Sequence, residues 1–240
     1  MRTKKNIKKF KRQSKKLKRM QKGGNFVIPK IIHQTWKSTE LPENYKKWSG
    51  TWKLLNKDWK YMFWSDEDLR NLVVNDYPEL LEMYDGFNTH IKRVDMARYL
   101  FLKKYGGLYV DMDFECLKPI DKLLENHSCV IGWEDKRYLC NAFMASTQNH
   151  KVWDNIIDYI KSLGHKHTKC VMGYPGYCTG NVMITDRILE YNKNKKNKNK
   201  VWLCPTKYIY PYSWYEKHLE NNEFPNAYAC HRWTATWAKK

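Results

Sequence analysis

One stretch in the middle of the chain, from Arg93 to Asp121, constrains the fold more than any other part of the sequence. Its first part, Arg93 to Tyr105, carries apolar residues at the i, i+3 and i+7 spacing of one buried helix face. Gly106 and Gly107 end this helix, because glycine accepts the left-handed backbone that a helix C-terminus commonly needs. A short β-prone run, Leu108 to Val110, follows, so the sequence predicts a helix, a tight turn and a strand in succession.

Two carboxylates, Asp111 and Asp113, come directly after the predicted strand. In extended backbone, residues two apart point to the same side, so both carboxylates can face one cation while Met112 points towards packing. Mg²⁺ and Mn²⁺ prefer oxygen ligands, and they take one or two carboxylates when phosphate oxygens complete the shell. Open α/β sheets bind ligands beyond the carboxyl ends of their strands. The pair therefore predicts a metal–diphosphate site, with a solvated acidic turn as the alternative.

The whole stretch resembles the signature of the family-32 glycosyltransferases. These are DXD-containing sugar transferases related to yeast α-mannosyltransferases and to bacterial capsule and lipopolysaccharide enzymes. Their pattern reads approximately SDxxRYxxLYxYGGxYxDxDxxxLKPLD. The matching residues are Asp95, Arg98, Tyr99, Leu102, Tyr105, Gly106, Gly107, Tyr109, Asp111, Asp113, Leu117, Lys118, Pro119 and Asp121. The resemblance implies a GT-A-like α/β fold, with a central, mainly parallel sheet flanked by helices.

Two further segments extend the resemblance towards both ends of the chain. The run Ile28 to Trp36, IPKIIHQTW, is similar to the opening motif of the family, and the run Tyr228 to Trp237, YACHRWTATW, is similar to its terminal motif YAxHHWxGSW. Arg232 stands where the family has a second histidine, so either His231 or Arg232 is expected to face the metal and diphosphate. Asn181, in TGN, replaces the proline that is usual in the family.

The resemblance also implies site residues. We expect the catalytic residues to be Asp95, Arg98, Asp111 and Asp113. We expect the donor to contact Trp36, Asp95, Arg98, Tyr109, Asp111 and Trp237. The expected metal ligands are Asp111, Asp113 and His231. Trp36 would leave the first strand and stack on the base of the donor, although a tryptophan in the core or at its rim is an equal alternative.

The sequence also predicts several flanking elements. A second strand is expected at Trp59 to Phe63, and the residues Ser65 to Asp68 are expected to cap the next helix. Asp66 is expected to be a cap residue rather than a pocket residue. A strand is expected at Cys129 to Trp133, and a helix at His150 to Leu163.

The positive charge is concentrated at the N-terminus. The formal net charge is +19, but Met1 to Lys22 holds twelve Lys or Arg and no acid, which leaves +7 for the rest. We expect residues 1–24 to be a disordered basic arm and residues 25–240 to be one catalytic domain. The alternatives for the arm are a basic amphipathic helix on an anionic membrane and a non-specific contact with nucleic acid.

The sequence carries few signs of secretion or membrane insertion. No apolar run approaches the eighteen or so residues of a bilayer span. The seven cysteines are scattered, odd in number and without a CxxC pair, which favours a reducing compartment. We therefore expect a cytoplasmic enzyme, peripheral at a membrane or associated with a particle.

The function implied by the resemblance is sugar transfer in polysaccharide biosynthesis. A hexose would move from a UDP- or GDP-sugar to a hydroxyl of a glycan, glycolipid or glycoprotein acceptor, with Mn²⁺ or Mg²⁺ and with retention of anomeric configuration. A metal-dependent phosphohydrolase would need more metal ligands than the sequence offers. The remaining alternatives are a catalytically inactive relative and a protein that binds nucleic acid or an anionic surface through the arm.

Overall fold

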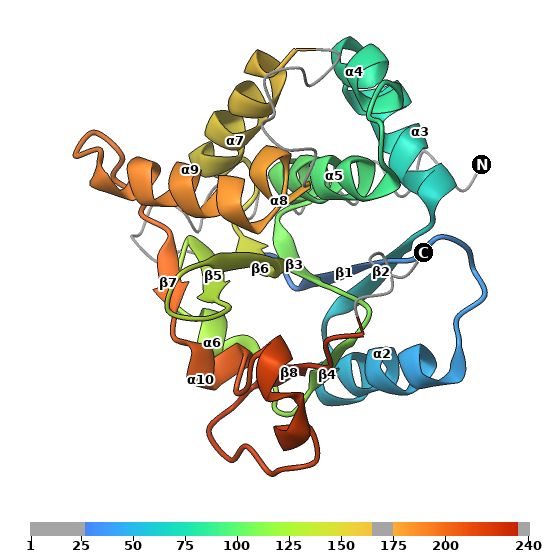
Figure 1. The fold of residues 1–240 in the computed structure, drawn as a ribbon, viewed down its shortest axis with the longest axis vertical. Helices are drawn as coiled ribbons and strands as arrows, with labels where there is room; N and C mark the ends of the chain where they lie inside the picture. The colour runs from blue at the N-terminus through green and yellow to red at the C-terminus, as the bar shows by residue number, and fades with distance from the viewer. Residues whose placement is uncertain (1–26, 165–174, 235–240) are drawn as a thin grey trace.

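The computed structural model describes residues 27–164 and 175–234, which form three layers with a six-stranded sheet in the middle (Figure 1). The strands, in spatial order, are β2 (Lys60–Trp64), β1 (Ile31–Thr35), β3 (Gly107–Val110), β6 (Leu139–Ser146), β5 (Cys129–Trp133) and β7 (Trp202–Cys204). Five of them run in one direction, and β6 is antiparallel to both of its neighbours. The prediction of a central, mainly parallel sheet is therefore confirmed.

Helices cover both faces of this sheet. One face carries α3 (Asp66–Asp76), η2 (Pro78–Leu80), α4 (Leu81–Asp85), α5 (His90–Tyr105), α7 (Lys151–Ser162), α8 (Pro175–Cys178) and α9 (Asn181–Lys193). The other carries α2 (Glu43–Leu55), α6 (Asp121–Leu124), α10 (Thr206–Ile209), η3 (Trp214–Leu219) and a small sheet of β4 (Phe114–Cys116) and β8 (Ala229–His231). Each face buries its own apolar cluster, because strand side chains alternate between the two sides.

The predicted helix, glycine turn and strand are present as α5, Gly106-Gly107 and β3, with the helix starting at His90 rather than Arg93. Both glycines have positive φ, 64° at Gly106 and 99° at Gly107. An added Cβ on Gly107 would lie 2.5 Å from the carbonyl oxygen of Ile31. The turn therefore reverses the chain where β1 and β3 pair closely, and α5 packs back along the strand that follows it.

This reversal brings the two halves of the central stretch together at one end. Arg98 lies eight residues before the turn, which is about 12 Å of helix. Asp111 lies four residues after Gly107, which is about 13 Å of strand. The equal lengths place Arg98 and Asp111 at the same height, beyond the carboxyl end of β3.

We expected an extended backbone from Asp111 to Asp113, and this prediction is wrong. β3 ends at Val110, and the next residues form a turn in which Phe114 N–H donates to the Asp111 carbonyl, at 3.1 Å. The chain then enters β4, which pairs with β8 in the register Phe114 to His231. The turn, rather than strand alternation, brings the two carboxylates to one place.

Two smaller expectations also need correction. Asp66 is not the helix cap: Ser65 is the N-cap of α3 and forms a capping box with Asp68, while Asp66 is 3.1 Å from His90 and lines a cavity. The second strand is shifted by one residue, to Lys60–Trp64. Residues 1–24 and Trp237 lie outside the described part. Within residues 27–164 and 175–234, no helix is long and apolar enough to cross a bilayer.

Candidate active site

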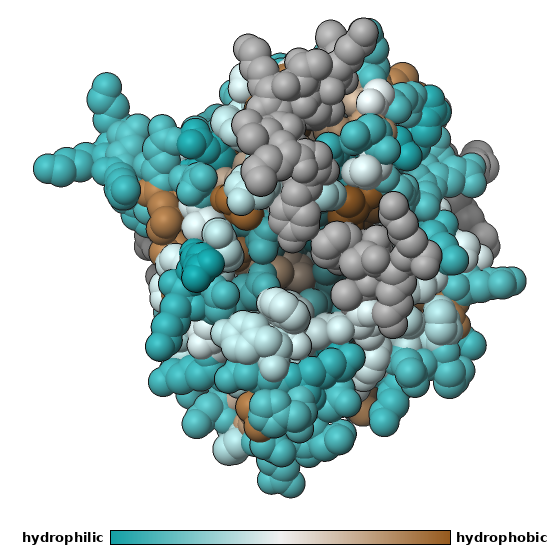
Figure 2. Space-filling model, viewed as in Figure 1, coloured by the Kyte–Doolittle hydropathy of each residue, from teal (hydrophilic) through white to brown (hydrophobic). Residues whose placement is uncertain are grey.

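A cavity of about 730 Å³ opens beyond the carboxyl ends of β1 and β3. This volume lies within the usual range for small-molecule sites. Residues of β1, α5, β3, the start of β6 and the segment after β8 line it, because β6 is antiparallel and begins at the edge where β3 ends. Figure 2 shows a hollow near the middle of this face, with hydrophilic residues to its left and residues of intermediate hydropathy below it.

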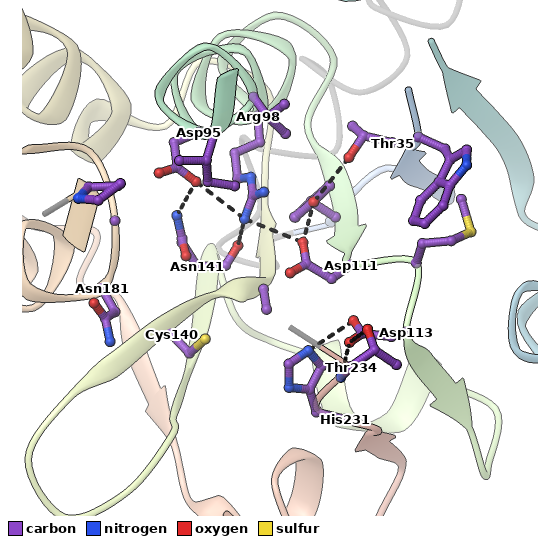
Figure 3. A pocket seen from close by; sticks show the side chains of 18 of the residues that line it. Thr35, Asp95, Arg98, Asp111, Asp113, Cys140, Asn141, Asn181, His231 and Thr234 are labelled. Atoms are coloured by element: carbon purple, nitrogen blue, oxygen red, sulfur yellow. Dashed lines mark hydrogen bonds and ion pairs between the residues drawn. The ribbon is translucent and has the colours of Figure 1, made fainter. Parts of the chain in front are cut away.

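Asp111 is held from one side by α5 and β3 (Figure 3). Its Oδ1 lies 3.3 Å from Arg98 Nη1 and accepts a hydrogen bond from the Tyr109 hydroxyl. The Arg98 guanidinium lies over the Tyr109 ring, 4.6 Å from its centre. Burial alone would lower the pKa of Arg98, but Tyr109 and both nearby aspartates raise it, so the arginine stays charged. Within the described residues Oδ2 of Asp111 has no partner, and it is available to a ligand.

Asp95 lies on α5 one turn before Arg98 and is almost completely buried. Its two carboxylate oxygens accept hydrogen bonds from Asn141 Nδ2, at 2.9 Å, and from Thr179 Oγ1, at 2.8 Å. Burial raises the pKa of Asp95 despite these donors and the Arg98 guanidinium at 3.6 Å. Arg98 also donates to the Asn141 carbonyl, at 3.0 Å. Asp95 and Asn141 therefore fix the arginine that holds Asp111.

Asp113 belongs to a second group, formed where β4 and β8 pair. Its Oδ1 lies 3.0 Å from His231 Nε2, and its Oδ2 accepts from both the hydroxyl and the backbone N–H of Thr234. Burial alone would raise the pKa of Asp113, but His231 and Thr234 hold it well below its usual value. Burial would likewise lower the pKa of His231, but the carboxylate of Asp113 raises it.

The two groups together form a candidate cation site. Ligand atoms of Asp111, Asp113 and His231 all lie within 4.8 Å of one another. His231 Nδ1 is buried, and no described residue bonds to it. Two carboxylates and an imidazole are a donor set that suits Mn²⁺ and also accepts Mg²⁺. Arg232 instead donates to Glu115, at 3.0 Å for Nε, so the structure turns His231, and not Arg232, towards the carboxylates.

Two tryptophans line the cavity. Trp36 follows β1 and packs against Tyr45, with ring centres 4.4 Å apart. Its indole N–H is buried and finds no acceptor in the part of the chain that the structure describes. Trp233 packs edge-on against His231, at 4.1 Å, and donates to the Tyr212 carbonyl, at 3.1 Å. Trp36 therefore lines the cavity and carries a buried, unpartnered N–H, while Trp233 packs against the histidine.

Several polar residues of the site were not predicted. Asn141 and Thr179 lie in the segments NAFMAS and TGN, and neither residue was expected in the site. Their contact with Asp95 joins residues more than forty positions apart, and no local pattern indicates it. Thr234 has no signal in the sequence, because its role depends on the pairing of β8 with β4.

Several known proteins resemble this chain in sequence. Residues 42–130 match the model of the family "glycosyltransferase sugar-binding region containing DXD motif". Inositol phosphoceramide mannosyltransferase 3 of Schizosaccharomyces pombe is 47% identical over 41% of this chain and 28% of its own length. An uncharacterized glycosyltransferase of Acanthamoeba polyphaga mimivirus is 29% identical over 88% of this chain and 84% of its own length.

A solved structure supports the fold. The PaToxG glycosyltransferase superposes with a TM-score of 0.56 at 17% identity, over 69% of this chain and 70% of its own. The chain spans about a quarter to two fifths of the first two curated relatives that it matches. The family resemblance and the GT-A-like fold class that the sequence predicted are confirmed.

Proposed function

We propose that this chain, which belongs to the DXD-containing glycosyltransferases of the GT-A type, transfers a hexose from a nucleotide sugar to an acceptor hydroxyl. One observation carries the proposal: Asp111, Asp113 and His231 converge within 4.8 Å in a cavity of about 730 Å³ beyond the strand ends. Such a position in an open α/β sheet suits a nucleotide ligand.

The three residues would hold a divalent cation, Mn²⁺ or Mg²⁺, which would neutralise negative charge on the diphosphate as it leaves. Arg98 forms an ion pair with Asp111, at 3.3 Å, and Asp95 forms a longer one with Arg98, at 3.6 Å. These residues would keep the carboxylate oriented while the donor binds. Because Asp95 is enclosed by Asn141 and Thr179, its main contribution would be to position the arginine.

We assign the base of the donor to the end of the cavity near Trp36. An indole ring can stack on a uracil or guanine base, and the unpartnered N–H can donate to an oxygen of the ligand. Tyr109 would act through Asp111, since its hydroxyl already donates to that carboxylate. The proposed donors are therefore UDP- and GDP-sugars, and the proposed stereochemistry is retention.

The names of relatives support the choice of acceptor: two are inositol phosphoceramide mannosyltransferases, and a third is an initiation-specific α-1,6-mannosyltransferase. A glycolipid or glycan acceptor and a mannose donor are therefore proposed first, with a glycoprotein acceptor as the next choice and polysaccharide biosynthesis as the setting. An anionic membrane or nucleic acid remains the proposed partner of the basic arm.

A cytoplasmic location stays a prediction. Five described cysteines, Cys116, Cys129, Cys140, Cys204 and Cys230, are free thiols, which favours a reducing compartment. Cys178 is disulfide-bonded, which counts against it.

The experiment is a panel of UDP- and GDP-sugars, each with Mn²⁺ and no acceptor, in which donor binding and slow hydrolysis are measured. At least one nucleotide sugar should bind and be hydrolysed in a Mn²⁺-dependent way. Binding without any turnover, with or without candidate acceptors, would favour the catalytically inactive relative. No binding of any nucleotide or nucleotide sugar would contradict the proposal.

A further inference from the structure

The cavity contains a carboxylate that the proposed chemistry does not use. Glu134 follows β5 in the turn that leads to β6, and its backbone N–H donates to the Tyr138 carbonyl, at 2.9 Å. Its side chain lines the same cavity as Asp111. The hydrogen-bonded turn holds Glu134 at the edge of the sheet where the other site residues gather.

Glu134 is poorly partnered compared with the other acidic residues of the cavity. Its nearest donors are Asn181 Nδ2, at a long 3.4 Å, and the thiol of Cys140. Within residues 27–164 and 175–234 no cation forms an ion pair with it. Burial raises its pKa, as expected for a carboxylate that has lost water without gaining strong donors. A carboxylate accepts about four hydrogen bonds, so Glu134 retains acceptor capacity.

Asn181 contributes the second polar group. It is the first residue of α9, and its Oδ1 accepts from the N–H of Val182, at 3.0 Å, which directs its Nδ2 towards Glu134. Figure 3 shows Asn181 and Cys140 on one side of Asp111 and Thr35 on the other. Asn181 and the Glu134 side chain that it contacts therefore lie on the side of the cavity away from Thr35, which precedes Trp36.

We propose that Glu134 and Asn181 form a sugar subsite that hydrogen-bonds neighbouring hydroxyls of a pyranose, on the side of the cavity away from Trp36. This inference rests on the proposed function. A free carboxylate repels phosphate and accepts from hydroxyl groups, while the amide beside it both donates and accepts. Paired hydroxyls offer one donor to the carboxylate and one acceptor to the amide. The hydroxyls belong either to the donor hexose or to the sugar of the acceptor.

The position of Asn181 at the start of α9 allows its side-chain amide to be removed without breaking the helix. The N–H of the first helical residue has no acceptor within the helix, and proline is well tolerated there. Asn181→Pro therefore removes the amide and leaves α9 able to form. Glu134→Gln keeps the size of the side chain and removes its charge. Glu125→Gln, at an exposed glutamate outside the cavity, is the matched control.

The test has two arms, with thermal unfolding as a check that each variant is folded. In the first, titration calorimetry with Mn²⁺ compares binding of the nucleotide diphosphate with binding of its nucleotide sugar. In the second, transfer is measured over a range of acceptor concentrations. Glu134→Gln and Asn181→Pro should bind the nucleotide diphosphate as the wild type does, within about twofold, because the subsite does not touch the base or diphosphate.

A subsite for the donor hexose predicts that both variants bind the nucleotide sugar at least about tenfold more weakly. A subsite for the acceptor predicts unchanged donor binding and an acceptor KM raised by at least about tenfold. If Glu134→Gln and Asn181→Pro both give wild-type values in both arms, as the control Glu125→Gln should, the proposed subsite is wrong. The proposed transferase function would not be affected by that result. A wild-type protein without nucleotide-sugar binding would instead overturn the proposed function.

Discussion

His231 and Arg232 are neighbours in the sequence, but their side chains have different partners. His231 Nε2 lies 3.0 Å from Asp113, whereas Arg232 donates to Glu115. His231→Ala should therefore raise the Mn²⁺ concentration for half-maximal donor hydrolysis at least about tenfold, as expected for a ligand or for a residue that orients one. Arg232→Ala should change it by less than about twofold. Mn²⁺ titration of donor hydrolysis measures both values. If the two substitutions shift the half-maximal Mn²⁺ concentration equally, His231 has no specific role in the metal site.

A second residue, His33 on β1, makes stability depend on pH. The indole N–H of Trp64 donates to His33 Nδ1, at 3.1 Å, so Nε2 carries the proton that is donated to the Gly106 carbonyl, at 2.9 Å. Protonation of Nδ1 would remove the acceptor for the Trp64 indole N–H. Burial lowers the pKa of His33 from 6.5 to about 4. The unfolded chain takes up a proton below pH 6.5 and the folded chain does not. Stability from the neutral His33 is therefore complete above pH 6.5 and falls until about pH 4.

Urea unfolding of the wild type and of His33→Gln isolates this contribution. The wild type should be the more stable at pH 7, and its advantage should shrink by about 3 kcal/mol between pH 7 and pH 4. Other buried histidines, such as His150, affect both proteins equally and cancel in the difference. A difference that stays constant over this range would mean that His33 titrates normally.

Among single residues of the central stretch, Asp111 and Asp113 could be predicted from their spacing. The other site residues of this stretch were expected only through the family resemblance. Asp95, Arg98, Tyr109 and Asp111 lie within one helix–turn–strand unit, and the structure brings them together. Glu134 and the donors to Asp95 could not be predicted in this way. Their positions depend on how α9 packs against β6 and how β6 and α8 pack against α5, and periodicity in the sequence does not encode that packing.

At the level of elements, the turn between α5 and β3 requires glycine. Gly107 has a φ of 99°, and a Cβ there would lie 2.5 Å from backbone oxygen of β1. Gly107→Ala should lower the free energy of unfolding by about 2–4 kcal/mol. Gly50 lies within α2, with nothing within 4 Å of an added Cβ, so Gly50→Ala should raise it by about 0.5–1 kcal/mol. Chemical denaturation of both variants measures these two changes in the free energy of unfolding. Changes of similar sign and size in the two variants would contradict the prediction.

The small sheet of β4 and β8 shows where prediction from local pattern ends. The C-terminal histidine was expected near the metal only through the family resemblance, because Phe114 and His231 pair across more than a hundred residues. The same pairing places His231 and Thr234 beside the Asp113 carboxylate, which contacts both of them. Local propensity predicts that a strand forms, but it does not predict the partner of that strand.

For the whole molecule, the basic arm should be separable from catalysis. Deleting residues 1–22 removes twelve positive charges and none of the residues that match the family motifs. Donor hydrolysis should stay within about twofold, while binding to anionic vesicles weakens in low salt and the difference fades near 1 M salt, where the Debye length is about 3 Å. Vesicle flotation and hydrolysis assays of the two proteins check this. If catalysis is lost on deletion, the arm is part of the catalytic domain.

The central claim is that Asp111 and Asp113 hold a divalent cation for sugar transfer, and donor hydrolysis as a function of Mn²⁺ in metal-stripped protein tests it most directly. Asp111→Asn keeps an acceptor for Tyr109 and should retain the wild-type melting temperature within a few degrees. Its Mn²⁺-dependent hydrolysis should fall at least about hundredfold, while Asp186→Asn, at an exposed aspartate outside the cavity, should match the wild type. Near-normal Mn²⁺-dependent turnover by Asp111→Asn would contradict the claim.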